Sequence, residues 1–240
     1  PALLDQLSNI GAGCFSTLFQ GVLVKRRGDE LNVNQLLSDI QRVVMEVRRR
    51  YPDTPVILYG ESMGALLALR LLREEKPPID IRGAILAAPV VALAKPPSPT
   101  FKKILSWASL YFPSFRISPE WFKKHAARFS HDPAIQRNLE TAPYRIEKVT
   151  LSFLENMGLL ITSGNEAAEQ IHSPVLVLGA GEDDYINPAQ LRGWFARIGS
   201  KDKMLVVFPN SFHRLLFDTD HTAVEATILD WINRRLCRSF

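Results

Sequence analysis

The feature that most constrains this chain is a serine between two glycines, in the pentapeptide Gly60-Glu61-Ser62-Met63-Gly64. The apolar run before it, residues 55–59, has the length of a strand, and the run after it favours a helix. A strand that turns sharply into a helix through this motif lifts the serine hydroxyl above the edge of a sheet. We expect Gly60 and Gly64 to leave space where the strand and helix backbones nearly touch. The pattern predicts Ser62 as a nucleophile at a helix N-terminus, where N–H groups stabilise negative charge.

Further apolar runs of strand length follow the pentapeptide, and each is continuous rather than alternating in polarity. Continuous apolar strands are typical of parallel sheets that are covered on both faces. The predicted strands are residues 15–24, 55–59, 82–89, 174–178 and 203–209. The predicted helices are residues 34–50, 63–74, 189–198 and 223–236, the first capped by Asn32 or Asn34. Strands that alternate with helices in this way predict an α/β fold with a mostly parallel sheet.

One long segment breaks this rhythm, because no strand is evident between residues 91 and 171. It opens with a proline-rich stretch and carries eight of the 22 aromatic residues within residues 101–129. We predict a core made of residues 1–95 and 169–240, with residues 96–168 inserted as a helical cap, or lid. The aromatic side chains can pack the cap onto the core, line an apolar acyl pocket over Ser62, or do both.

A serine hydroxyl needs a base to take its proton, and the base needs a carboxylate to orient it. His213 is the predicted base, because it alone among five histidines directly follows the end of a predicted strand. The others lie in the insertion, before a strand or at a helix start: His125, His131, His172 and His221. In α/β-hydrolases the acid lies between the serine and the histidine in the chain.

Three carboxylates stand where the acid is required, in the loop after strand 174–178: Glu182, Asp183 and Asp184. Such residues also occur as solvated loop side chains or as helix caps, so their position alone leaves the choice open. A metal site is not predicted, because no histidine or cysteine lies at ligand spacing nearby. No cofactor is predicted either.

Taken together, Ser62 in its pentapeptide, the segment 181–186 and the segment 210–213 resemble the monoglyceride lipase/lysophospholipase branch of the α/β-hydrolases, which includes serine aminopeptidase-like hydrolases. The resemblance covers residues 30–236 and implies the α/β-hydrolase fold with a cap. The family pattern G-x-x-D-x-I/V selects Asp184 as the acid, and Met63 inherits the backbone N–H of the oxyanion hole. Glu61 and Ala65 stand where the family often has His and Gly, and neither change removes a catalytic group.

The resemblance fails upstream of the pentapeptide. The family's His-Gly loop, which supplies the second oxyanion N–H, has no counterpart, and residues 19–21 match the next strand and loop poorly. Since the chain begins at Pro1 rather than Met, we expect it to lack the N-terminal part of the family fold. Losing one oxyanion donor typically costs about 10²–10³ in rate.

The charge of the chain is mildly basic, with a net charge of +4 and a pI near 9.2. The basic runs 48–50 and 234–235 close predicted helices, where cations complement the dipole; weak attraction to an anionic membrane surface is the alternative. Nothing indicates a nucleic-acid module, a membrane span or a signal peptide. Cys14 and Cys237 favour a reduced, cytoplasmic protein, although a bridge between them stays open.

The resemblance therefore implies a serine carboxylic ester hydrolase that works through an acyl-enzyme on lipid-like esters such as monoacylglycerol or lysophospholipid. One alternative is a small-peptide or amide hydrolase with the same triad, in which Glu61 or a cap carboxylate holds the substrate amine. The other is a truncated hydrolase-fold protein of little activity that acts as a binding scaffold.

Overall fold

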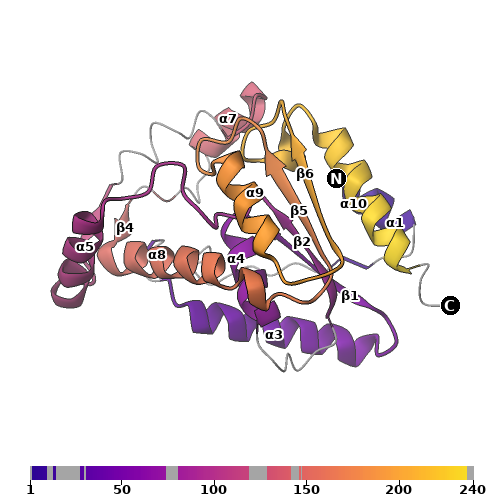
Figure 1. Cartoon of the computed structure of the whole chain (residues 1–240), viewed down its shortest axis with the longest axis horizontal. Helices are drawn as coiled ribbons and strands as arrows, with labels where there is room; N and C mark the ends of the chain where they lie inside the picture. The colour runs from indigo at the N-terminus through magenta and orange to yellow at the C-terminus, as the bar shows by residue number, and fades with distance from the viewer. Residues whose placement is uncertain are drawn as a thin grey trace.

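The sheet is parallel throughout, with the strand order β1-β2-β5-β6 (Figure 1). We describe a computed structural model, which covers residues 2–9, 13–14, 28–29, 31–73, 81–118, 129–141, 146 and 148–236. The strands are β1 (Val56–Glu61), β2 (Ile81–Ala87), β5 (Val175–Ala180) and β6 (Lys203–Phe208). They confirm the four strands predicted between residues 55 and 209, and the carboxyl ends of all four meet at one edge of the sheet.

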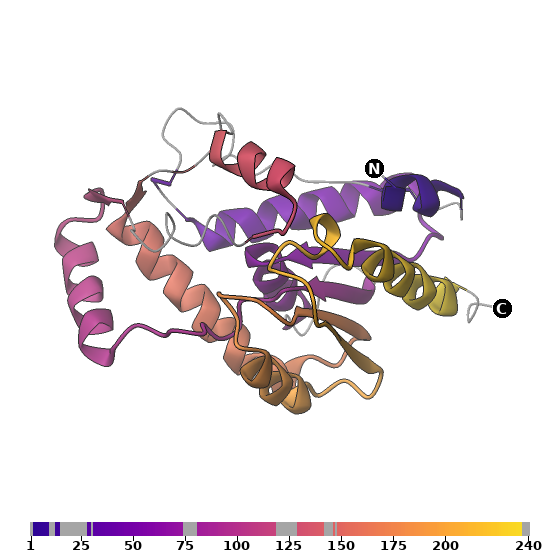
Figure 2. The ribbon, with the colours of Figure 1, turned by 90° about the horizontal axis from the view of Figure 1, so that it is seen from above.

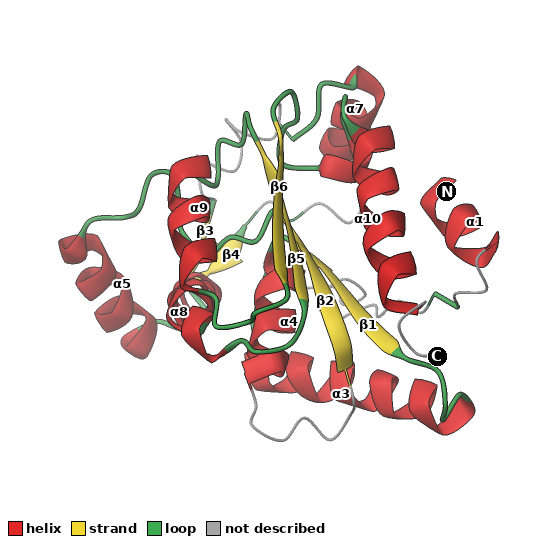
Figure 3. Cartoon of the chain, turned by 45° about the vertical axis from the view of Figure 1, so that its right-hand side comes forward, coloured by secondary structure: helices red, strands yellow, loops and turns green. Residues whose placement is uncertain are grey.

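The two faces of the sheet are covered by different helices (Figure 3). Side chains alternate between the faces along a strand, so Leu86 and Val177 lie in one buried cluster while Ile85 and Leu176 lie in another. The first cluster contains residues of α3 (Val33–Arg50), α4 (Met63–Arg73) and α9 (Pro188–Arg197). The second contains residues of α1 (Ala2–Asn9) and α10 (His221–Leu236). Burial on both faces explains why the strands read as continuous apolar runs.

The arginines of the basic run that ends α3 form hydrogen bonds with groups close to them in the chain. Arg49 and Arg50 bind Glu46 at 2.7–2.8 Å, and hydrogen bonds from these two arginines lower the pKa of that carboxyl to about 2. Arg48 donates to two backbone carbonyls of the following loop, each at 3.0 Å. Arg234 near the end of α10 binds Asp230 in the same way. Both basic runs lie in the last turn of a helix, as predicted.

The chain between β2 and β5 is mainly helical, as predicted, but the expectation that it holds no strand is wrong. Two strands of two residues each pair antiparallel within it, β3 (Arg116–Ile117) and β4 (Val149–Thr150). Such short strands have no periodicity that a sequence pattern could reveal. Within its described residues, the segment forms the helices α5 (Pro99–Tyr111), α7 (Pro133–Thr141) and α8 (Leu151–Glu166), followed by the short 3₁₀ turn η2 (Ala168–Gln170). Helices α5 and α8 lie side by side at the end of the molecule opposite α10 (Figure 2).

The second half of α8 packs into the main core of the protein. Leu160 belongs to the cluster that contains α4, and a Cβ on Gly164 would come within 2.7 Å of the Leu66 side chain. The indole N–H of Trp194 donates to the carbonyl of Gly164 at 3.2 Å. The second half of α8 falls within the predicted cap, yet it contacts the core of the protein directly. The boundaries of the cap stay a prediction.

Several predictions lie outside the described residues: the strand at 15–24, the positions of Trp121, Phe122 and His125, and the pairing of Cys237. Cys14 is described, and it is an exposed free thiol. Among the helices of the described ranges, none combines the length and the apolar character needed to cross a bilayer.

Candidate active site

Ser62 occupies a strained turn between β1 and α4. Its φ of +56° lies in the left-handed region, which residues other than glycine rarely adopt. The Ser62 N–H donates to the carbonyl of Ala87 at 2.9 Å, and its own carbonyl accepts from Ala65 at 3.2 Å. The next strand therefore holds the turn from one side and the first turn of α4 holds it from the other. This is the geometry that lifts a nucleophilic serine clear of a sheet edge.

Close contact with neighbouring backbone atoms requires glycine at only one of the two positions that flank the Ser62 turn. A Cβ on Gly60 would lie 2.5 Å from the carbonyl oxygen of Gly64 and 2.7 Å from the Cα of Ala65. A Cβ on Gly64 would meet no described atom within 4 Å. The prediction is confirmed for Gly60 and is wrong for Gly64, which contributes its backbone to the contact rather than its lack of a side chain.

His213 lies between Ser62 and a carboxylate. It comes from the loop after β6, and its Nε2 is 2.9 Å from the Ser62 Oγ. Its Nδ1 is 2.8 Å from Oδ2 of Asp183, and the side chains of His213 and Asp183 are only 4% and 1% exposed. When Asp183 is ionised, Nδ1 donates to it and Nε2 is left to accept the serine proton. The structure thus brings together Ser62 and His213, as the sequence predicts.

The carboxylate at His213 belongs to Asp183, so the choice of Asp184 is wrong. Asp183 Oδ1 accepts from the backbone N–H groups of Tyr185 at 2.8 Å and Ile186 at 3.2 Å, which leaves Oδ2 free to face the imidazole. Ile186 is buried and anchors this turn, so the side chain three positions before it points inward. The family pattern, counted from Gly181, selected the next residue instead.

The loops that carry Asp183 and His213 are bonded to each other. The Gly181 N–H donates to the carbonyl of Phe208 at 2.8 Å, and the Glu182 N–H donates to the carbonyl of Ser211 at 3.0 Å. A Cβ on Gly181 would lie 2.5 Å from the carbonyl oxygen of Pro209. These backbone contacts fix the distance between the segments that carry Asp183 and His213.

An ion pair connects the neighbours of the serine and the histidine. Arg214 Nε lies 3.1 Å from Oε1 of Glu61, and both side chains are mostly buried. The Arg214 guanidinium also lies over the ring of Phe217, 4.8 Å from its centroid. Sequence analysis missed this pair, because nothing in the spacing of two isolated charges 153 positions apart signals a contact.

Two aromatic rings surround the imidazole of His213. The ring of Phe129, from the insertion, stacks on Tyr185 at 5.1 Å and meets the His213 ring edge-on at 5.7 Å. The Tyr185 ring lies 5.2 Å from the imidazole. Burial, together with the charges of Asp183 and Asp184, raises the pKa of the Tyr185 hydroxyl, so it stays neutral. Phe129 was predicted as one of the packing or pocket aromatics, but its contact with the base carried no sequence signal.

Met63 is the first residue of α4, directly after the serine. The N–H groups of a first helical turn have no acceptor within the helix and point outward from its N-terminus. This places the predicted oxyanion N–H beside Ser62. Residues 19–21, the poorly matching segment near the expected second donor, lie outside the described residues. In the part of the chain that the structure describes, no three or more His, Cys, Asp or Glu residues gather as metal ligands would.

The chain is similar to proteins of known sequence and structure. The family model described as serine aminopeptidase, S33 matches residues 17–220. The phospholipase YtpA of Bacillus subtilis is 22% identical over 206 residues, which are 85% of this chain and 77% of that protein. The crystal structure of a monoacylglycerol lipase from Paleococcus ferrophilus is 19% identical with a TM-score of 0.83, covering 98% of this chain and 88% of that one.

A second solved structure shares the fold at lower similarity. It is a soluble variant of monoglyceride lipase from Saccharomyces cerevisiae in complex with a substrate analog, 18% identical with a TM-score of 0.69. The match covers 85% of this chain and 68% of that chain. These likenesses confirm the α/β-hydrolase fold that the sequence predicts.

The contrast between the two glycines predicts opposite effects on stability. Gly60→Ala forces a Cβ into backbone atoms, so we expect it to lower the free energy of unfolding by about 1–3 kcal/mol. Gly64→Ala places a methyl group in open space at a helix position, where Ala is favoured over Gly by up to about 1 kcal/mol. Urea denaturation of both variants checks this. Equal destabilisation by the two substitutions would contradict the account of the turn.

Proposed function

Since this chain belongs to the serine aminopeptidase, S33 family, we propose that it is a serine carboxylic ester hydrolase that works through an acyl-enzyme. The observation that carries the proposal is the hydrogen-bonded series of Ser62, His213 and Asp183, with contacts of 2.9 and 2.8 Å. Each of the three follows the carboxyl end of a parallel strand. This arrangement is the one that activates a serine for attack on a carbonyl carbon.

The reaction begins when Ser62 Oγ attacks the acyl carbonyl carbon and His213 Nε2 takes the hydroxyl proton. Asp183 stabilises the imidazolium that forms, and the Met63 N–H at the start of α4 donates to the oxyanion. The intermediate then collapses, and the alcohol leaves with the proton of His213. Water, deprotonated by His213, attacks the acyl-enzyme in turn, which releases the acid and restores Ser62.

The substrate we propose is a lipid-like ester, such as a monoacylglycerol or a lysophospholipid. The names of similar proteins support this class, since they include a phospholipase and monoacylglycerol lipases. One aromatic ring of the insertion, that of Phe129, lies against His213 and supports an apolar acyl site beside it. Five of the other predicted pocket aromatics lie exposed on α5 and the residues after it, so they neither pack the insertion onto the core nor carry the acyl-site proposal. A long acyl chain would bury its methylenes against Phe129.

A peptide or amide substrate is less well supported. In that alternative, Glu61 is the carboxylate that holds a substrate amine. The structure pairs Glu61 with Arg214 at 3.1 Å, so its charge is already balanced within the protein. The scaffold alternative gains no support from a serine–histidine–aspartate series whose atoms lie at hydrogen-bonding distance.

The acyl-site proposal predicts a preference for long chains. Because each buried methylene contributes about 0.8 kcal/mol, we expect kcat/KM for nitrophenyl octanoate to exceed that for the acetate by at least about tenfold. An aminoacyl nitroanilide measured in parallel should be hydrolysed more slowly than either ester. Higher kcat/KM for the acetate would contradict a lipid substrate, and faster nitroanilide hydrolysis would favour the peptidase alternative.

Helix α5 offers a surface for the lipid aggregate in which such substrates reside. Seven large apolar side chains of α5 and the residues after it are 49–74% exposed: Phe101, Ile104, Trp107, Leu110, Tyr111, Phe112 and Phe115. Residues 95–115 contain three lysines and no acidic residue, whereas the charge of Arg116 is balanced by Asp29 at 2.5 Å. A basic helix with exposed aromatic side chains is suited to lie on an anionic lipid surface. We propose that α5 makes the peripheral membrane contact.

This contact predicts binding to vesicles that depends on both charge and apolar area. We expect the protein to sediment with vesicles containing anionic phosphatidylglycerol, and less with pure phosphatidylcholine or at high salt. The double variant Trp107→Ser/Leu110→Ser should bind at least about tenfold more weakly. Met45→Ser, which alters an exposed apolar residue of α3, is the control and should bind as the unmodified protein does. Unchanged binding of the double variant would rule out α5 as the contact.

A further inference from the structure

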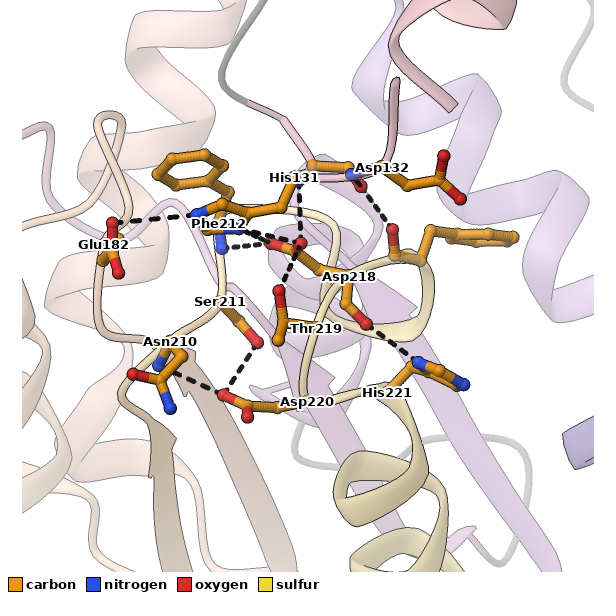
Figure 4. Close-up of polar contacts among 12 residues, drawn as sticks. His131, Asp132, Glu182, Asn210, Ser211, Phe212, Asp218, Thr219, Asp220 and His221 are labelled. Carbon is orange, nitrogen blue, oxygen red and sulfur yellow. Dashed lines mark hydrogen bonds and ion pairs between the residues drawn. The ribbon is translucent and has the colours of Figure 1, made fainter. Parts of the chain in front are cut away.

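A second histidine–carboxylate pair, His131 and Asp218, joins the insertion to the loop that carries His213 (Figure 4). Asp218 lies between the short 3₁₀ helix η3 (Leu215–Phe217) and α10, and its side chain is fully buried. Its Oδ1 accepts from the backbone N–H of His131 at 2.8 Å and contacts the ring Nδ1 of His131 at 3.0 Å. Its Oδ2 accepts from the backbone N–H of Phe212 at 2.5 Å. The carboxylate therefore joins two segments that lie far apart in the chain.

Both of these segments reach the catalytic base. Phe212 directly precedes His213, and His131 belongs to residues 129–132, which we call the strap because they bind across the His213 loop. The strap makes two further hydrogen bonds to that loop, from Ser130 Oγ to the carbonyl of Phe217 at 2.5 Å and from the Arg214 N–H to the carbonyl of Phe129 at 2.9 Å. The rings of His131 and Phe212 stack at 3.8 Å.

The base loop is also fixed from its other side. Oδ2 of Asp220 accepts from the backbone N–H of Asn210 and from the Ser211 hydroxyl, both at 3.1 Å (Figure 4). Asp220 and Asp218 together therefore hold residues 210–212. Of these two carboxylates, Asp218 alone is bonded to the strap as well.

The strap affects the surroundings of His213 because Phe129 is its first residue. The ring of Phe129 lies against the imidazole of His213 and stacks on Tyr185, so the position of the strap sets the position of this ring. An apolar ring against the imidazole excludes water from the base and limits its rotation. Nothing in the contacts of Ser62, His213 and Asp183 themselves performs this task.

The negative charge of Asp218 strengthens the hydrogen bonds that join the strap to the His213 loop. Burial alone would raise the pKa of this carboxyl, but hydrogen bonds from the backbone of His131, Phe212 and Thr219 and from the His131 ring outweigh it, so its pKa lies below the ordinary value. The group is therefore ionised at neutral pH. A buried carboxylate depends on its donors, because each lost hydrogen bond leaves charge unsatisfied.

We propose that Asp218 and His131 are positioning residues for the hydrolysis: they dock the strap onto the His213 loop so that Phe129 covers the catalytic imidazole. This inference rests on the proposed function, in which His213 is the base. The pair touches neither the reacting serine nor the acid, and it acts through Phe212 and Phe129.

The test compares substitutions that keep or remove the side-chain N–H at His131. His131→Asn retains an N–H near the position of Nδ1, whereas His131→Leu does not. We expect His131→Leu to lower kcat for nitrophenyl octanoate about tenfold with a smaller change in KM, and His131→Asn to stay within about threefold. Asp218→Asn should resemble His131→Leu, and combining the two should add little further loss. His221→Leu is the control, because its ring bonds the backbone carbonyl of Asp218 rather than the carboxylate.

A measurement independent of turnover is the proton NMR signal of the His213 Nδ1–H that faces Asp183. We expect this signal to be sharp in the unmodified protein and in His131→Asn, and broadened by exchange with water in His131→Leu. An unchanged signal and unchanged kcat in His131→Leu would overturn the proposal, as would lowered stability with the signal intact. If the unmodified protein hydrolyses no ester, the proposed function fails, while the NMR comparison still decides whether the strap covers the imidazole.

Discussion

The parallel direction of the four strands is the constraint on which the site depends. Parallel strands present all their carboxyl ends at one edge, so the loops after β1, β5 and β6 meet there. Ser62, Asp183 and His213 each come from one of these loops, although the serine and the histidine are 151 positions apart. Apolar burial on both faces of the sheet holds the strands in register, and the register in turn sets the distances between the three side chains.

Contacts beyond the three residues make that edge rigid. Glu61 and Arg214 connect the Ser62 turn to the His213 loop. Backbone hydrogen bonds from Gly181 and Glu182 connect the Asp183 loop to the segment that carries His213. The His213 loop is therefore bonded to the segments that follow β1 and β5. Asp218 also connects it to the insertion, through hydrogen bonds from the backbone of Phe212 and His131. An imidazole that must face both a serine and a carboxylate needs this restraint.

Much of the fold could be predicted because its signals are local. Strands that are buried on both faces are continuous apolar runs, and a sharp strand-to-helix turn requires a small residue such as Gly60, so both leave a mark in the sequence. Ser62 and His213 could be predicted because each lies after such a strand, Ser62 directly after Glu61 and His213 in the loop that follows Phe208. The short strands β3 and β4 left no mark, since two residues cannot show a period.

The choice between Asp183 and Asp184 could not be made from residue order. It depends on which carboxylate accepts the N–H groups of Tyr185 and Ile186 and so turns toward the imidazole, which is a property of the folded loop. The contact between the strap and Asp218 could not be predicted from the sequence for a related reason. Its contact with Asp218 joins residues 87 positions apart, and a histidine before a helix resembles any surface histidine until the two segments are seen together.

The proposed reaction requires that Ser62 is a nucleophile activated by His213 and Asp183. Labelling with a fluorophosphonate, followed by mass spectrometry of the modified peptide, tests it most directly. The folded protein should carry the label on Ser62, and Ser62→Ala should carry none. Asp184→Asn should react at close to the unmodified rate, while Asp183→Asn should react about 10²–10⁴ times more slowly. A folded protein that fails to react, or slow labelling of Asp184→Asn with normal labelling of Asp183→Asn, would contradict the account.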